Sequence, residues 1–206
     1  MVHRFAASKT LGTLFSVVFL AAVFFFPSTA LSENRVGDFK GTLDINATLG
    51  MELLDPHDWE PIHTPLYYGI DLGYEGRFWP AGLCGSLYYS AASDKTDSGD
   101  SVDGSITKLY LGIRKRVGLP SRIFDPYLQG GIAGATATID HEELGEDTSS
   151  GYGYWFGGGS YVRLGGVFHA GLDLRYTFGS AKLLGSYRNI GGLGAGAVIG
   201  MEFGGR

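Results

Sequence analysis

Polar and apolar residues alternate along most of this chain, most cleanly in residues 167–178. One parity there is wholly apolar: Phe168, Ala170, Leu172, Leu174, Tyr176 and Phe178. The other parity carries a histidine, an acid and a base, at His169, Asp173 and Arg175. A period of two indicates an extended strand, whose side chains point alternately to opposite faces. The polar face would meet water in a soluble sandwich, whereas in a membrane barrel the apolar face would meet lipid.

The same period recurs in seven further segments, with no helical period between them. Together they predict strands at residues 39–51, 66–78, 83–91, 105–117, 126–139, 152–164, 167–178 and 191–203. The facing of the fifth strand, rich in glycine and alanine, is ambiguous. The connections alternate between short turns and long polar loops, which are predicted at residues 52–64, 92–104, 140–151 and 179–189.

This alternation of connections is typical of outer-membrane barrels, which have short turns at one end and long loops at the other. In lipid every backbone N–H needs a partner, so an open sheet edge is excluded and the first strand must pair with the last. We therefore predict an all-β fold, an eight-stranded antiparallel up-and-down transmembrane β-barrel.

Charged residues fall mainly on the parity that would face the interior. We predict a lumen charge network of Asp44, Asp71, Glu75, Arg77, Lys108, Arg114, His169, Asp173, Arg175 and Glu202. His169 is expected to form a hydrogen-bonded pair with Asp173. Eight strands enclose a space just wide enough for side chains, and inward glycines of the last strand would leave room for the ionic groups. The expected lumen is plugged and forms no open pore.

The N-terminus has the pattern of a secretory signal peptide. A basic region with Arg4 and Lys9 precedes an apolar core and a stretch of small residues. We expect cleavage within residues 30–32, so that residues 1–32 are the signal peptide and residues 33–206 the barrel domain. The apolar core, about 16 residues long, is short for a membrane-spanning anchor helix of ~20.

The charge and the cysteine count exclude some classes of protein. The formal net charge of the 206-residue chain is −5, and loss of the two signal bases makes the remainder more acidic. An acidic chain is a poor ligand for nucleic acid, so no nucleic-acid partner is expected. Cys84 is the single cysteine, which rules out an internal disulfide.

Three segments resemble the strands of the small OmpA-like, OmpX-like and opacity-protein-like barrels. They are residues 124–135, FDPYLQGGIAGA, residues 172–178, LDLRYTF, and the closing residues 196–203. The resemblance covers residues 37–206. It implies a monomeric eight-stranded barrel in the outer membrane of a double-membraned bacterium. It also implies a role in envelope stability, adhesion or host-factor binding, with the contacts in the long loops.

The function expected from these patterns is structural or surface-interacting. The expected partners are outer-membrane lipid and lipopolysaccharide, with a possible extracellular ligand at loops 52–64, 92–104, 140–151 and 179–189. A small-solute porin and a soluble lipocalin-like binder are the alternatives without catalysis. A barrel enzyme acting on lipid A is the third alternative, but a resemblance to the lipid A deacylases would need a serine two residues after the histidine. Gly171 holds that position after His169.

No catalytic, cofactor or metal site is predicted. The loop from Asp55 to His63 contains two histidines and three acids, but without a metal-ligand spacing. It is expected to be a solvated loop. The acids of the two following loops do not have the calcium-loop spacing either. Those acidic loops could bind divalent ions together with lipopolysaccharide.

Overall fold

The computed structural model describes residues 41–59, 62–95, 101–117, 123–141, 145–183 and 186–204. These residues lie in one compact unit, Phe39–Arg206. The predicted signal peptide lies outside the described residues. None of the helices in the described ranges has both the length and the hydropathy needed to cross a membrane.

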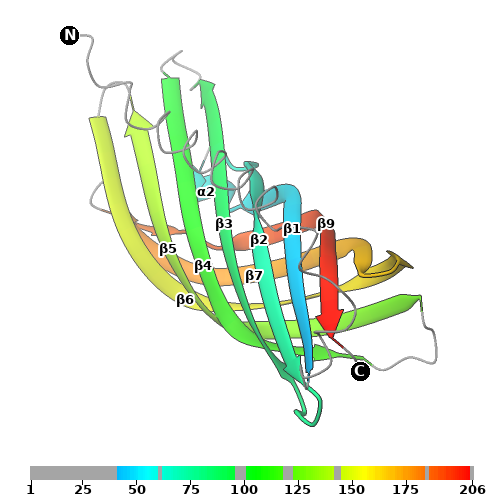
Figure 1. The fold of residues 1–206 in the computed structure, drawn as a ribbon. Coiled ribbons are helices and arrows are strands. Elements are labelled where there is room, and N and C mark those ends of the chain that lie inside the picture. The colour runs from blue at the N-terminus through cyan, green and yellow to red at the C-terminus, as the bar shows by residue number, and fades with distance from the viewer. Residues whose placement is uncertain are drawn as a thin grey trace. The chain divides into compact units, whose positions relative to one another are not determined.

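The described residues of this unit form nine strands and one short helix (Figure 1). Their bounds are β1 Gly41–Leu54, α2 Pro56–Trp59, β2 Leu66–Gly76, β3 Gly82–Lys95, β4 Ser101–Arg116, β5 Phe124–His141, β6 Gly145–Gly165, β7 Phe168–Leu183, β8 Ser186–Asn189 and β9 Gly192–Gly204. All pairings are antiparallel, in the order β6-β5-β4-β3-β2-β1-β9-β7, and β6 also pairs with β7. The sheet is therefore closed, and the predicted eight-stranded barrel is confirmed. Four-residue β8 is an addition that pairs with β7.

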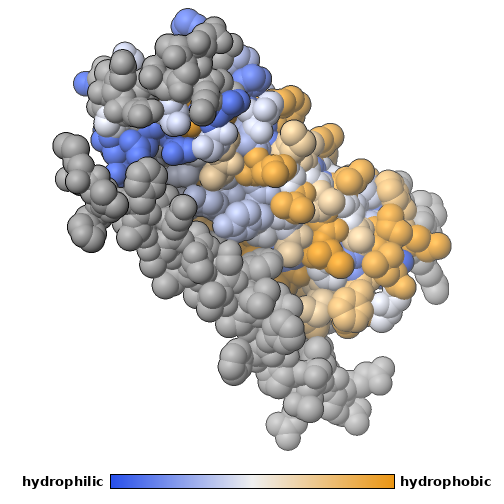
Figure 2. All heavy atoms as spheres, turned by 90° about the horizontal axis from the view of Figure 1, so that it is seen from above, coloured by the Kyte–Doolittle hydropathy of each residue, from blue (hydrophilic) through white to orange (hydrophobic). Residues whose placement is uncertain are grey.

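The two parities of each strand point as the sequence pattern predicts. Leu172 and Ile199 are 67% and 61% exposed on the outer wall, whereas Asp173 is 2% exposed inside. β5 turns Leu128 outward and Gln129 inward, which settles its facing. Figure 2 shows hydrophobic residues over much of the visible wall and hydrophilic residues gathered at one end.

The strands continue into the segments predicted as long loops, so those loop boundaries are wrong. β5 and β6 stay paired out to His141 and Gly145, and β3 and β4 out to Lys95 and Ser101. Residues 179–183 belong to β7, and β8 follows them. The backbone ladder does not require an apolar outer face, so it persists where outward residues become polar. Figure 1 shows β4, β5 and β6 rising beyond the end of β1.

The β6–β7 connection is a tight turn, as the sequence predicts, but it lies at Gly166 and Val167, one residue later than the predicted strand ends place it. Gly165 and Gly166 have φ values of 125° and 58°. Both values are unfavourable for residues with a Cβ atom, so glycine is required in this hairpin.

Candidate functional site in the barrel interior

Arg116, on β4, lies at the centre of a charged layer at the short-turn end. It forms ion pairs with Asp44 and Glu202, with Asp125 at 3.2 Å and with Glu75 at 3.7 Å. Asp44 and Glu202 are register partners on β1 and β9, so two carboxylates stand side by side there. One guanidinium thus joins acids from four strands and offsets their mutual repulsion.

Arg175, on β7, occupies the middle of the interior and is 3% exposed. Its Nη2 lies 3.2 Å from Asp71 and 3.4 Å from Asp173. Three rings also surround the guanidinium, with centroid distances of 4.7 Å to Tyr88, 4.7 Å to Tyr110 and 4.5 Å to Trp155. Cation–π contacts of this kind strengthen when the cation is removed from water.

Hydrogen bonds hold the two carboxylates that face Arg175. Asp71 accepts from Thr48 at 2.6 Å, from Ser86 at 2.5 Å and from Tyr88 at 2.8 Å. Asp173 accepts from Tyr127 at 2.7 Å and from Gln129 at 2.8 Å. A buried charge is tolerated when it is both paired and hydrogen-bonded, and these partners come from several strands.

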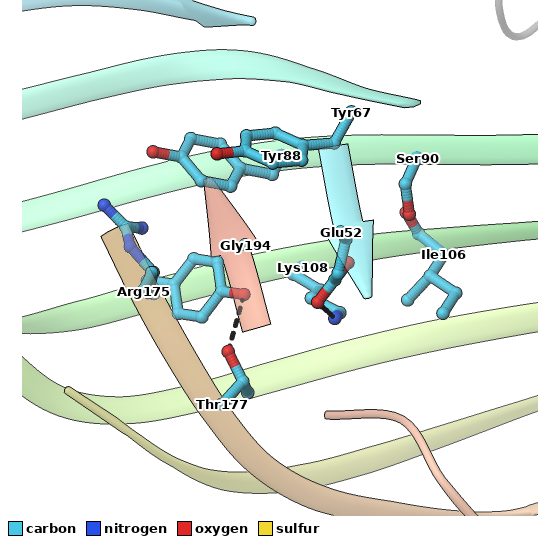
Figure 3. Close-up of a pocket in the computed structure, with 10 residues that line it drawn as sticks. Glu52, Tyr67, Tyr88, Ser90, Ile106, Lys108, Arg175, Thr177 and Gly194 are labelled. Carbon is cyan, nitrogen blue, oxygen red and sulfur yellow. Dashed lines mark hydrogen bonds and ion pairs between the residues drawn. The ribbon is translucent and has the colours of Figure 1, made fainter. Parts of the chain in front are cut away.

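Lys108 and Glu52 form a buried ion pair on the loop side of Arg175 (Figure 3). Beside this pair, the hydroxyl groups of Tyr110 and Thr177 lie 3.0 Å apart. A cavity of about 10 Å³ lies between these groups. That is the room needed by a single water molecule.

An apolar layer fills the interior at the loop end. Its buried residues are Leu54, Trp59, Ile62, Val102, Ile106, Ala135, Ala137, Ile139, Ala181 and Ile190. The predicted solvated loop is therefore wrong for Trp59 and Ile62, which are 2% and 5% exposed. Burial of their apolar surface draws this segment into the mouth of the barrel.

The predicted network residues divide into groups. Those that line the interior are Asp44, Asp71, Lys108, Arg114, His169, Asp173, Arg175 and Glu202. Glu75 is partly exposed at the rim, with a side chain exposed by 26%. Arg77 does not reach the interior: it follows the end of β2, is exposed, and its guanidinium lies 5.6 Å from the Phe78 ring centroid.

The predicted pair of His169 and Asp173 is wrong. The Nε2 atom of His169 lies 2.6 Å from Asn46 Oδ1, and its ring packs against Tyr161. Residues four apart on a strand are separated by about 13 Å, which is too far for a hydrogen bond.

The sequence reasoning missed several interior groups. Arg116 shares the inward parity of Arg114, and that parity was the signal that could have found it. Glu52 falls in the predicted loop 52–64, although it lies on β1. Among the described residues, no group of three or more His, Cys, Asp and Glu side chains could hold a metal ion.

Comparisons with known proteins identify the fold. No family model and no curated protein matches the chain. Among solved structures, OprG from Pseudomonas aeruginosa matches 82% of this chain and 99% of its own, with 12% identity and a TM-score of 0.56. Neisserial surface protein A matches 80% of this chain and 97% of its own, with 13% identity and a TM-score of 0.54. The N-terminal β-barrel domain of P. aeruginosa OprF matches 79% and 99%, with 18% identity and a TM-score of 0.52.

This chain has the fold of the small eight-stranded outer-membrane barrels. The outer-membrane barrel fold accounts for the closed sheet, the apolar outer wall and the polar interior together. At these identities the similarity concerns the fold alone.

Proposed function

We propose that this protein is an integral outer-membrane barrel with a closed interior and a structural or surface-interaction role. The observation that carries the proposal is that apolar residues face outward and ionic residues face inward, the opposite of a soluble protein. Exposed Leu172 and Ile199 alternate with buried ionic residues on the same strands. An apolar outer belt needs lipid. The predicted signal peptide, residues 1–32, would deliver the chain for export, and the protein acts as a monomer.

The paired charges support a closed lumen. Arg116, Arg175 and Lys108 each form ion pairs with interior carboxylates, at three positions in the interior. A permeating ion would have to separate these pairs in a confined, weakly solvating space. We propose no catalytic step, because buried His169 is hydrogen-bonded to an amide and Gly171 stands where a nucleophile would be needed.

The surface role is assigned to the loop end. Exposed acids there, Asp94, Asp103, Asp140 and Glu146, lie at the extended ends of β3 to β6. Divalent cations could link these carboxylates to the anionic groups of lipopolysaccharide. The name of Neisserial surface protein A places that protein at a cell surface, and we propose the same site of action for this chain.

Planar-bilayer recording of the purified barrel tests the closed lumen against the porin alternative. We expect no large, stable conductance steps at any protein concentration that gives insertion. The control is the heat-unfolded protein in the same detergent. Reproducible large channels from the folded form would refute the closed interior.

Deletion of the gene tests the cellular role. We expect altered envelope permeability or adhesion, with exchange of residues 92–104 or 140–151 abolishing the adhesion effect alone. A deletion strain that matches its parent in both assays would contradict the proposed role.

A further inference from the structure

Helix α2 and Ile62 lie in the outer mouth of the barrel. The cap consists of α2 and Ile62, with Trp59 and Ile62 pointing into the apolar layer. Gly104 on β4 provides a seat for it: a Cβ atom at this position would lie 2.3 Å from Ile62 Cδ1 and 3.7 Å from Trp59 Cζ3. A larger residue at position 104 would displace the cap.

A small set of polar contacts, which we call the latch, ties α2 to the segment ending β8. The Nε1 atom of Trp59 donates to the Asn189 carbonyl at 2.5 Å. The backbone N–H of Asn189 donates to Asp58 Oδ2 at 2.7 Å. Arg188 donates to the Asp58 carbonyl. These three hydrogen bonds of Asp58 and Trp59 thus converge on two consecutive residues, Arg188 and Asn189.

Apart from the latch and the packing of Trp59 and Ile62 in the apolar layer, the described residues give the cap little support. Four residues are too few for a helix to be stable by itself, and a single turn is closed by the carbonyl of Asp55, which accepts from the backbone of Asp58 and Trp59. Asp55, Pro56 and His57 are exposed. A second small cavity of about 10 Å³ is lined by Trp59 and Ile106, so packing beneath the indole is incomplete.

We propose that α2 is a releasable cap: breaking the latch lets Trp59 leave the mouth and exposes the apolar layer to the outside, while the ionic interior below stays closed. The hinge points are the two ends of the segment, where Leu54 N–H donates to the His63 carbonyl at 2.8 Å and Glu52 N–H donates to the Pro65 carbonyl at 3.0 Å. These contacts fasten the segment to the wall without involving Trp59. This device goes beyond the proposed structural role.

Cysteine labelling with a membrane-impermeant maleimide tests the cap. The background is Cys84→Ser, and the reporter is Ile106→Cys, because Ile106 is 2% exposed beneath the cap. With the latch intact we expect slow labelling. Asp58→Ala should accelerate it roughly tenfold, the factor that corresponds to loss of one hydrogen bond to a charged group. Gly104→Val places a side chain where Ile62 packs and should therefore displace the cap and accelerate labelling as well.

Two matched reporters give the limits. Ala133→Cys, from the middle of the interior, should stay unlabelled in every variant, and Thr148→Cys, on the exposed end of β6, should label fast in all of them. Heat-modifiable gel migration verifies that each variant is folded. Val102→Cys is a second reporter in the same apolar layer, and it checks whether the substitution at position 106 disturbs the cap. We expect it to label in the same pattern as Ile106→Cys.

Three results would overturn the proposal. If Ile106→Cys labels no faster after Asp58→Ala or Gly104→Val, the cap is a fixed part of the wall. Ile106→Cys could label as fast as Thr148→Cys with the latch intact, which would mean that the mouth is open. Ala133→Cys could label in step with it, which would mean that the whole barrel opens. None of these results depends on bilayer conductance, so the cap and the closed lumen fail separately.

Discussion

At the scale of single residues, glycines on the inner wall leave space for large side chains that reach over from other strands. A Cβ atom at Gly200 would lie 1.9 Å from Asn46 Oδ1 and 2.8 Å from His169 Nε2. At Gly196 it would lie 2.6 Å from the Tyr67 hydroxyl. The hydrogen bond between Asn46 and His169 is therefore possible because position 200 has no side chain.

Gly200→Ala should destabilise the barrel by about 1–3 kcal/mol, because overpacking forces the buried amide and imidazole apart. The matched control is Gly134→Ala on the outer wall, where a Cβ atom would meet nothing within 4 Å. Urea unfolding followed by heat-modifiable migration measures both changes. Equal stability of the two variants would show that the crossing at Gly200 is not tight.

At the scale of the element, β7 separates two environments across one strand. Leu172 and Leu174 are more than half exposed outside, while Asp173 and Arg175 are 2% and 3% exposed inside. Because side chains alternate, a slip of one residue would place the charges outside and the leucines among ions. In the membrane location that we propose, the lipid would therefore favour the observed strand register.

Leu172→Arg should destabilise the lipid-embedded protein by about 2–4 kcal/mol, the cost of a basic side chain near the middle of a bilayer. Leu164→Arg, at the turn end of β6, is the control and should cost about 0–1 kcal/mol, because it lies close to an interface. Folding titrations into lipid vesicles measure the difference. A Leu172→Arg variant as stable as the control would mean that this face does not meet acyl chains.

The extents of the elements show what alternation alone can predict. It correctly predicts the strands and their facing where the outer residues are apolar, as in 167–178. The alternation stops at the apolar belt, because outward Thr148 and Ser150 resemble loop residues, although they pair with Thr138 and Thr136 across β5 and β6. The ladder there depends on backbone pairing, which no side-chain pattern records. β8 is missed for the same reason.

At the scale of the whole molecule, the interior ties distant strands together. Arg175 of β7 pairs with Asp71 of β2, and its guanidinium packs on rings from β3, β4 and β6. These strands are far apart in sequence and, for β2 and β7, are not hydrogen-bonded neighbours. The network acts across the barrel rather than along its wall.

Arg175→Met should cost about 3–5 kcal/mol, because it leaves Asp71 and Asp173 buried without their shared cation. The control is Arg163→Gln, since Arg163 has a side chain exposed by 42% and pairs with Glu202 at the rim; an exposed pair contributes about 0–1 kcal/mol. Equilibrium unfolding of both variants in the same detergent supplies the comparison. The cross-barrel role of Arg175 would be contradicted if its loss cost no more than that of Arg163.

The sequence predicts which residues face inward but not which of them meet. Parity places Asp173 and His169 on one face, yet spacing along the strand keeps them apart and gives each a partner from another strand. The cap is missed for a different reason. Trp59 is the one tryptophan in a loop sequence dominated by acids, histidines and prolines. The local sequence does not show that Trp59 packs on apolar residues of β4 and β5 at the mouth of the barrel.

The apolar layer and the ionic layer follow one another along the barrel axis, and this order affects any solute that enters the interior. A hydrated ion that enters from the loop side would first have to lose its water in the apolar layer under Trp59. An apolar molecule would enter that layer, but the buried ion pairs around Arg175 would then exclude it. In the closed interior that we propose, these two layers of opposite polarity lie in series, and we expect neither ions nor apolar molecules to pass both.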